Sequence, residues 1–316
     1  MSYTEEELND RLAQVTETYG AWSEDIPLPY GKWTKGNGEV PHRRLKRSIQ
    51  IIRDVMGGHF ESARILDLGC LDGIYSIECA LQGAHVLGID VRKGHIEKCL
   101  LAKRALQLEN LDFRTGDVRA ILAEPMDPFD VILCSGLLYH LNAPDVFDVI
   151  ERIYERTLRV AIFDTHVSLN PTSTVSFREK LYHGHTAIEH GDNATPADIE
   201  DAGWSSFGNR ASFWLTRPSL VNALAEIGFS SVYECLTPPL ININKPGVAH
   251  RDRCTFVCLK GEPVTLKTSP VTNTLAEDWP ENALDYSQRP QCAPRFAGLR
   301  SLLRQARGLL FQRRPK

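Results

Sequence analysis

The sequence predicts an α/β fold built around a parallel β-sheet, and two observations lead to this prediction. Apolar, β-rich segments alternate with segments of helical periodicity from Arg64 to Lys260, a pattern typical of parallel sheets with right-handed crossovers. The first apolar segment, residues 64–68, leads through Gly69 and Gly73 into a helical pattern. A glycine turn at the carboxyl end of a strand lets the backbone approach a ligand closely, and open α/β sheets bind ligands at this edge.

Seven strands and four helices follow from this pattern in chain order. The strands are expected at residues 64–68, 85–90, 111–116, 129–135, 159–166, 230–238 and 253–261. The helices between them are expected at residues 73–82, 93–109, 142–155 and 218–228. We expect residues 62–262 to form this core, with a long insertion at 170–212 after the fifth strand.

Further segments are expected on both sides of the core. In residues 1–61, Thr4 and Glu7 suit a capping box that opens a first helix, and apolar spacing predicts a second helix at 43–56. The basic residues of that second helix are expected to form a solvated face: Arg43, Arg44, Lys46, Arg47 and Arg53. Residues 263–316 are expected to form a proline-bearing linker and a basic amphipathic helix. Such a helix suits a membrane surface, a partner, nucleic acid, a second subunit or its own chain.

Composition narrows the class of protein. The 316 residues are 42% apolar and 24% charged, which is ordinary for a globular protein, and the net charge of −4 argues against a broad nucleic-acid footprint. The eight cysteines form no CxxC pair, so we expect reduced thiols. The polar, acidic first twenty residues and the lack of an apolar stretch of about 20 residues lead us to expect a soluble cytoplasmic protein.

Acidic residues end the first three predicted strands or follow them. Asp67, Gly69 and Gly73 form the pattern D-x-G-x-x-x-G, which is not the dinucleotide fingerprint G-x-G-x-x-G. Asp90 ends the second strand, where a carboxylate can accept the hydroxyls of a ribose or cap the next helix. Asp117 follows the third strand and can also cap a turn.

This order of motifs resembles the class I S-adenosylmethionine (SAM) methyltransferases, beginning with their motif I at Asp67–Gly73. The resemblance implies a Rossmann-like, seven-stranded sheet with SAM as cofactor. It also implies that Asp117 bonds the adenine amino group while Val118 covers the ring. The expected cofactor-binding set is Asp67, Gly69, Cys70, Gly73, Asp90, Val91, Asp117, Val118 and Ser135.

The insertion at 170–212 lies after a strand that ends at the cofactor edge, so we expect it to form a lid or to supply substrate contacts. It contains His183, His185 and His190, with Glu189 nearby. Imidazole and carboxylate are common metal ligands, but the spacing matches no strong metal signature. We therefore assign His183 and His185 to substrate binding and assign no metal.

A narrower resemblance rests on the segments GLLYH, SFWLTRPSL and IGFSSV, on KW at Lys32–Trp33 and on HRDRCTF. These segments are similar to the bacterial tRNA wobble-uridine carboxymethyltransferase family and its many relatives. The resemblance implies that Lys32, Tyr139 and either Arg251 or Arg253 hold the extra carboxylate of carboxy-SAM. The insertion and the RDRCTF stretch depart from that family, so we expect ordinary SAM and a smaller acceptor, with Lys32, Trp33 and Arg253 on the substrate side.

Methyl transfer from SAM is a direct displacement, so the protein mainly aligns the reactants and removes a proton. His140, after the fourth strand, and His166, ending the fifth, are the two candidate bases, and Tyr139 is expected to orient acceptor or methyl. The histidine-rich rim favours an oxygen acceptor on a small molecule or saccharide. Two alternatives remain: a tRNA carboxymethyltransferase using carboxy-SAM, and an NAD-dependent oxidoreductase or non-catalytic nucleotide-binding module.

Overall fold

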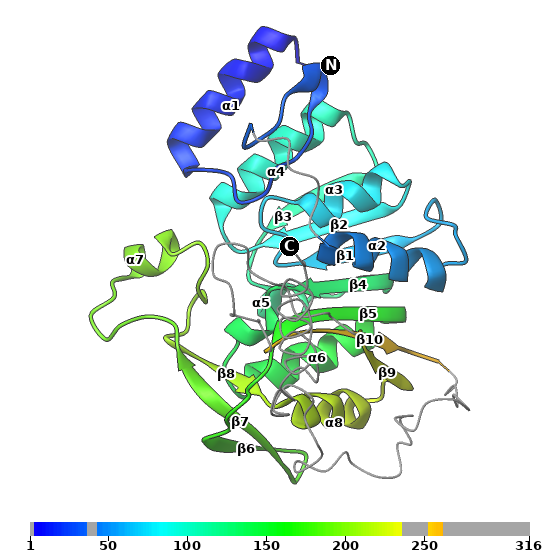
Figure 1. The fold of residues 1–316 in the computed structure, drawn as a ribbon, viewed down its shortest axis with the longest axis vertical. Helices are drawn as coiled ribbons and strands as arrows, with labels where there is room; N and C mark the ends of the chain where they lie inside the picture. The colour runs from blue at the N-terminus through cyan, green and yellow to red at the C-terminus, as the bar shows by residue number, and fades with distance from the viewer. Residues whose placement is uncertain (1–2, 37–42, 236–251, 262–316) are drawn as a thin grey trace, which may run out of the picture. The chain divides into compact units, whose positions relative to one another are not determined.

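The computed structural model describes residues 3–36, 43–235 and 252–261 (Figure 1). The chain divides into two compact units, Met1–Glu281 and Asn282–Lys316, and every described residue belongs to the first unit. The expected basic helix near the carboxyl terminus and Arg251 lie outside the described residues.

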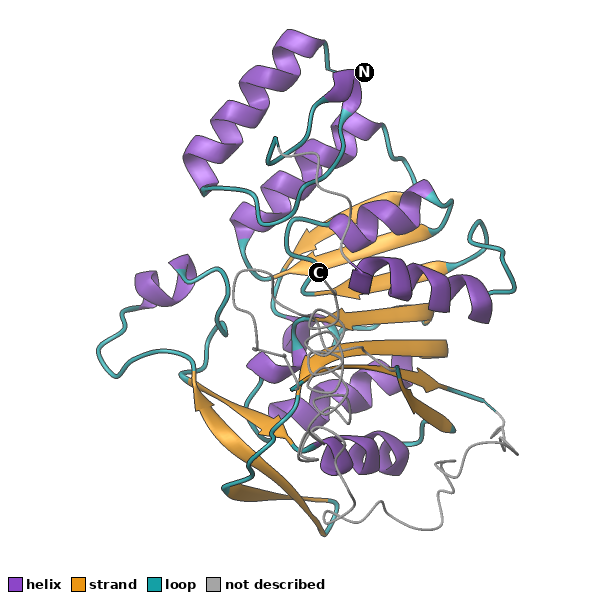
Figure 2. Ribbon diagram, in the orientation of Figure 1, coloured by secondary structure: helices purple, strands orange, loops and turns teal. Residues whose placement is uncertain are grey.

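A seven-stranded sheet forms the centre of the first unit, in the order β3-β2-β1-β4-β5-β10-β9 (Figure 2). The strands are β1 (Arg64–Leu68), β2 (His85–Asp90), β3 (Leu111–Thr115), β4 (Phe129–Ser135), β5 (Thr157–His166), β9 (Ser231–Glu234) and β10 (Arg253–Leu259). Strands β1 to β5 are parallel, whereas β10 pairs antiparallel with both β5 and β9. The carboxyl ends of five consecutive strands therefore meet at one edge of the sheet.

Helices cover both faces of this sheet because its strands are apolar on both faces. In β1, Ile65 packs on one side with α2 (Arg43–Val55), α3 (Ile74–Leu81) and α4 (Lys93–Leu106). Its neighbours Leu66 and Leu68 pack on the other side with α5 (Val118–Ile121), α6 (Asp145–Arg156) and α8 (Arg217–Ile227). The alternation of side chains along a strand thus divides the core into two layers.

The amino-terminal segment packs on the first of these layers. Helix α1 (Glu5–Tyr19) begins with the predicted capping box of Thr4 and Glu7 and contacts α4; a 3₁₀ turn, η1 (Pro29–Gly31), follows it. The loop after α1 is bound by Asp72, a fully buried carboxylate in the glycine turn that accepts the backbone N–H groups of Ser23 and Glu24. The Lys98 ammonium lies 3.8 Å from Asp72 and donates to the carbonyl of Ala21. This buried pair attaches the extension to the cofactor-loop side of the core.

The insertion after β5 forms a second, antiparallel sheet in the order β6-β7-β8. Its elements are β6 (Ser173–Phe177), β7 (Lys180–Ile188), the short helix α7 (Pro196–Asp201) and β8 (Ala211–Leu215). One face of this sheet packs on α6, where Phe177 stacks on Phe147 with ring centroids 4.5 Å apart. The insertion is thus a folded element with a core contact, although the sequence predicted no strand within it.

The predicted seven-stranded α/β sheet is confirmed, with small differences at the ends of elements. Helix α4 ends at Leu106 instead of residue 109, since Gln107 adopts a left-handed conformation with φ 57° and caps the helix. Strand β9 ends at Glu234, and residues 236–238 of the strand predicted there lie outside the described residues. Among the described residues, no helix is both long and apolar enough to cross a membrane.

The buried pair of Asp72 and Lys98 leads to a prediction about stability. Removing one member of a buried ion pair typically costs about 3–5 kcal/mol, because the other charge remains buried without a partner. We expect Asp72→Asn to lower the free energy of unfolding by about 3 kcal/mol in urea titrations, and by clearly less in a Lys98→Met background. Additive effects of the two substitutions would show that these groups do not interact.

Candidate active site

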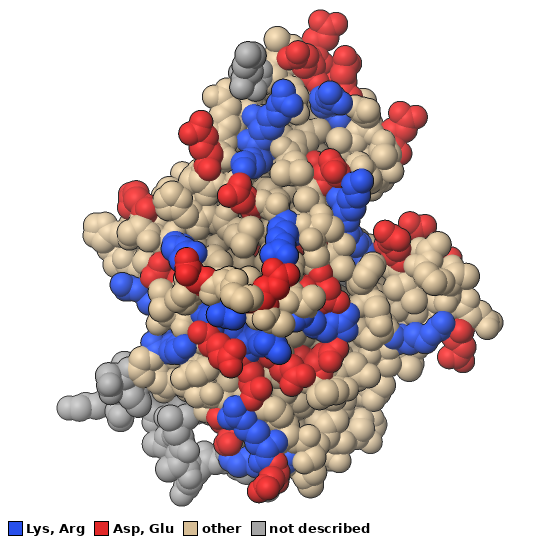
Figure 3. Space-filling model, turned by 180° about the vertical axis from the view of Figure 1, so that it is seen from behind, with Lys and Arg blue, Asp and Glu red and all other residues tan. Residues whose placement is uncertain are grey.

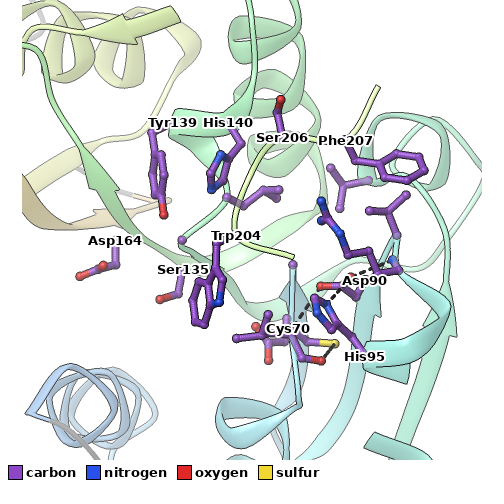
Figure 4. Close-up of a pocket in the computed structure, with 18 of the residues that line it drawn as sticks. Cys70, Asp90, His95, Ser135, Tyr139, His140, Asp164, Trp204, Ser206 and Phe207 are labelled. Carbon is purple, nitrogen blue, oxygen red and sulfur yellow. Dashed lines mark hydrogen bonds and ion pairs between the residues drawn. The ribbon is translucent and has the colours of Figure 1, made fainter. Parts of the chain in front are cut away.

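A cavity of about 400 Å³ opens at the carboxyl edge of β1 to β5. Figure 4 shows Tyr139 and His140 on one side of it and Cys70, Asp90 and His95 across from them. Its walls come from the glycine turn, from the ends of β2 to β5, from β10 and from the insertion. The volume lies in the range of small-molecule sites.

The glycine turn forms the floor of the cavity and has positive φ angles at Gly69, Leu71 and Gly73. Gly69 lines the cavity with φ 69°, and a Cβ there would lie 3.3 Å from Leu137. Gly73 has φ 88° and begins α3, and a Cβ there would lie 2.9 Å from the Cys99 sulfur. Gly73 does not line the cavity, so it supports the turn from behind instead of touching a ligand.

Asp90 holds the turn from the end of β2. Its Oδ2 accepts the Leu71 N–H at 3.1 Å, and its Oδ1 accepts the Arg92 N–H at 2.9 Å and lies 3.0 Å from His95 Nδ1. A carboxylate offers about four acceptor positions, so Oδ2 keeps capacity for a hydroxyl in the cavity, which Asp90 and Val91 both line.

Asp117 and Val118, which follow the end of β3, line the cavity. The Arg119 guanidinium binds both Asp117 oxygens, and Oδ1 also accepts the Arg119 N–H. Burial opposes the charge of Asp117, but these bonds outweigh it and hold the pKa of the carboxyl below its usual range. Asp117 is therefore an ionised helix cap that also faces the cavity.

Asp67 is the most strongly perturbed carboxylate of the site. It lies one residue before the end of β1 and is 2% exposed. Its Oδ2 accepts the Ser76 hydroxyl at 2.6 Å. Burial raises the pKa of Asp67 to about 6, although the Ser76 bond opposes the shift. A cation bound in the cavity would stabilise its ionised form.

His140, in the turn η2 (Leu138–His140), is oriented by a residue of the insertion. Its Nδ1 lies 3.0 Å from Glu189 Oε1. Glu189 also accepts the Ser212 hydroxyl at 2.8 Å and the Ser206 N–H at 3.2 Å. Burial opposes the charge of Glu189, but its bond with His140 and these donors keep the pKa of its carboxyl below the usual range. With Nδ1 engaged, Nε2 of His140 is left to act as a base.

His166, at the end of β5, forms a second histidine–carboxylate pair. Its Nδ1 lies 2.8 Å from Asp252 Oδ2. Its ring stacks on Trp214 at 5.0 Å and meets Tyr139 edge-on at 4.7 Å. Both candidate bases and Tyr139 therefore line one cavity together with the cofactor acids.

Arginines form the wall beside Tyr139. Arg253 lies 5.0 Å from the Tyr139 ring and binds the buried carboxylate of Asp164. Burial opposes the charge of Arg253, but Asp164 raises its pKa above the usual range. Arg44 and Arg47 of α2 also line the cavity, and Arg44 Nη1 lies 3.5 Å from Asp164. The prediction of a solvated basic face was wrong for these two arginines, because α2 lies against the cavity edge.

Four residues predicted to bind substrate do not line the cavity. Lys32 pairs with Glu5 at 3.2 Å, and Trp33 forms a β-bridge with Pro27. His183 and His185 lie on β7, and the Nδ1 of His185 binds the Ser168 hydroxyl. The structure places these four side chains outside the cavity, because the extension and the small sheet hold them on their own elements.

A further part of the site is the segment Gly203–Phe207 of the insertion, which we call the strap. The sequence predicted that the insertion contributes to the site but did not single out these residues. All five of its residues line the cavity. Arg92 donates to the carbonyls of Ala202 and Ser205, and Arg119 donates to the carbonyl of Phe207. The signal in the sequence that could have identified the strap is Trp204, a large aromatic residue inside the long insertion.

Neither a metal cluster nor a disulfide is found at the site. Among the described residues, no group of three or more His, Cys, Asp or Glu side chains is placed to hold a metal ion. The buried thiols of Cys70 and Cys99 both contact the carbonyl of Leu71. Burial raises the pKa of both thiols, so they pack as neutral groups beneath the turn.

Comparisons with known proteins agree with this geometry. Residues 65–159 match the family model described as "Methyltransferase domain". This part of the chain is therefore similar to a methyltransferase domain. Among solved structures, the chain shares its fold with the N-terminal domain of EvdMO1 with SAH bound. The TM-score is 0.59, and the sequences are 19% identical over 82% of this chain and 97% of the other. A second structure of that domain, in the presence of SAH and D-fucose, gives a TM-score of 0.57.

Curated relatives match a short part of the chain. Ubiquinone biosynthesis O-methyltransferase of Maricaulis maris is 34% identical over 88 residues, which are 28% of this chain and 34% of the relative. The protein of the same name from Xylella fastidiosa is 38% identical over 85 residues, 26% of this chain and 33% of the relative. The match thus spans about a third of the relatives' length.

The raised pKa of Asp67 predicts a pH-dependent stability of the unliganded protein. Between its ordinary value of 3.8 and about 6, the folded state holds a proton that the unfolded state has lost. Burial of the charge therefore does not affect the free energy of unfolding below about pH 4. Above about pH 6 it lowers the free energy of unfolding by roughly 3 kcal/mol. Asp67→Asn lacks this cost and keeps an acceptor for Ser76, so its stability relative to the wild type should rise between pH 4 and 6. A constant difference across that range would contradict the shift.

Proposed function

We propose that the protein transfers the methyl group of SAM to a hydroxyl oxygen of a small molecule or saccharide. The observation that carries this proposal is the pairing of His140 with Glu189 in the same cavity as Asp67 and Asp90. A base beside a nucleoside-type site suits methylation of a hydroxyl, which must lose a proton, more than methylation of a neutral amine.

The residues at the edge of the sheet fit SAM. Gly69 has no side chain at a place where a Cβ would lie close to Leu137, so its backbone is accessible to a ligand. Oδ2 of Asp90 can still accept a hydrogen bond from a ribose hydroxyl. Asp117 and Val118 offer an acceptor and an apolar surface for adenine. Arg44 and Arg47 suit the carboxylate of the amino-acid end, since guanidinium groups bind carboxylates with directed hydrogen bonds.

When bound, SAM supplies a methyl group that is already activated on a sulfonium. The protein therefore has two tasks, which are to align the acceptor oxygen and to accept its proton. We assign proton acceptance to Nε2 of His140, with Glu189 as the positioning residue that holds Nδ1. We assign acceptor alignment to Tyr139 and His166, whose ring is fixed between Trp214 and Tyr139.

Two features bear on the acceptor. Curated relatives of the domain are named ubiquinone biosynthesis O-methyltransferases, and a protein of the same fold was crystallised in the presence of D-fucose. These names favour a hydroxyl on a ring as the target. On the face shown in Figure 3, basic and acidic side chains are interspersed, which offers no single-sign surface there for a nucleic acid.

Carboxy-SAM as donor remains the second candidate, because Tyr139 and Arg253 do meet in the cavity. Lys32, the third residue implied for the carboxylate, pairs with Glu5 instead. We therefore favour ordinary SAM. An NAD-dependent reaction is not proposed, since the turn between Gly69 and Gly73 lacks the dinucleotide spacing.

Calorimetric titration with SAM, SAH, carboxy-SAM and NAD tests the cofactor assignment. We expect SAM and SAH to bind, with Asp90→Asn weakening both by about ten- to a hundredfold through lost hydrogen bonds to a charged group. Asp112→Asn is the matched control, because the Asp112 carboxylate on β3 is 77% exposed and pairs with Lys103. A clear preference for carboxy-SAM or NAD would overturn the assignment.

The proposed base leads to a kinetic prediction. With methyl-labelled SAM and a panel of phenols and sugars, His140→Ala should lower kcat by about 10²- to 10⁴-fold and leave SAH affinity unchanged. Glu189→Ala should shift the pH profile of kcat and lower its maximum, and Glu189→Gln should recover part of it. His183→Ala, on β7 outside the cavity, is the control and should match the wild type. Unchanged kcat in His140→Ala would exclude this histidine as the base.

A further inference from the structure

The strap carries an aromatic side chain, Trp204, to which the proposed function assigns no role. Trp204 is 69% exposed although it lines the cavity. Among the described residues, its indole has no hydrogen-bond or ring partner, and Figure 4 shows it pointing into the cavity. Large aromatic side chains are usually covered when they lie in a concave site, because their burial is strongly favourable.

Two arginines fix the strap above the ends of β2 and β3. Arg92 donates to the carbonyls of Glu200 at 3.2 Å, Ala202 at 2.7 Å and Ser205 at 3.0 Å. Arg119 donates to the carbonyl of Phe207 at 3.2 Å. The strap is thus attached on both sides of Trp204, so its backbone is held in place while the indole stays exposed.

Both anchors belong to the proposed nucleoside site. The backbone N–H of Arg92 donates to Asp90, and the guanidinium of Arg119 binds Asp117. Gly203 lies on the same side, where a Cβ would be 3.8 Å from His95 Nε2. His95 itself binds Asp90. The strap therefore faces the acids assigned to ribose and adenine rather than Arg253 and Arg44 at the other end of the cavity.

We propose that Trp204 binds the nucleoside half of SAM, with its indole stacked over that half as a cover from the insertion. The inference rests on the proposed function, since it takes SAM as the ligand. An indole stacks on a purine or on a ribose face without needing hydrogen bonds, and the exposed apolar surface of Trp204 becomes buried in the complex. The neighbouring Ser206 N–H bonds Glu189, so the same strap contacts both the nucleoside side and the partner of His140.

Calorimetry with SAH and with adenosine tests this assignment on the full chain. We expect Trp204→Ala to weaken both ligands by a similar factor, about tenfold or more, and Trp204→Phe to lose less. Leu181→Ala is the matched control, because Leu181 is a 66% exposed apolar residue of the same insertion that does not line the cavity. Its affinities should equal those of the wild type.

Tryptophan fluorescence supplies an independent readout. Saturation with SAH should shift the emission of the wild type to shorter wavelength, and this shift should vanish in Trp204→Phe and persist in Trp33→Phe. If the wild type binds SAH in the calorimeter but Trp204→Ala binds it equally well, the inference fails and the proposed function stands. If Trp204→Ala changes only the KM of an acceptor, the indole belongs to the acceptor site and the inference is overturned. If the wild type binds no SAH, the proposed function fails first.

Discussion

The carboxylate of Asp90 holds the site together. It is buried, and a buried charge is stable only when donors surround it. Its donors are the N–H of Leu71 in the glycine turn, the N–H of Arg92 and the ring of His95. Because the Arg92 side chain in turn binds the strap, one carboxylate connects the cofactor turn to the insertion.

The two halves of the cavity differ in chemistry. The half near β2 and β3 presents carboxylates and the strap, whereas the half near β4, β5 and β10 presents Tyr139, two histidines and arginines. Parallel strands that end at one edge make this division possible, since each contributes its terminal side chain to the same opening. Glu189 and Ser206, both from the insertion, link the two halves through one hydrogen bond.

Much of the fold could be predicted because its determinants are local. Asp67, Asp90 and Asp117 were found because each ends or follows an apolar segment, and strand order then brings them together. Thr4 and Glu7 predicted the first helix start for the same reason, since a capping box involves residues three apart.

The features of the site that could not be predicted depend on contacts between segments distant in the sequence. Glu189 meets His140 across 49 residues and Arg92 meets Ala202 across 110 residues, and no local pattern encodes such pairs. Lys32 is the opposite case. The resemblance implied a ligand-binding role, but packing of the extension pairs Lys32 with Glu5 outside the cavity. Arg44 and Arg47 were misread because a basic helix face looks the same in sequence whether it meets water or a cavity.

The central claim is that one cavity holds the nucleoside and the sulfur of the cofactor and the proposed base His140 in sequence along the sheet edge. A crystal structure of the full chain with SAH tests this claim most directly. We predict ribose hydroxyls on Asp90, adenine beside Asp117 and Val118, and the sulfur directed toward Tyr139 and His140. A ligand bound in the opposite direction, with adenine beside Arg253 and its sulfur remote from both histidines, would contradict the account.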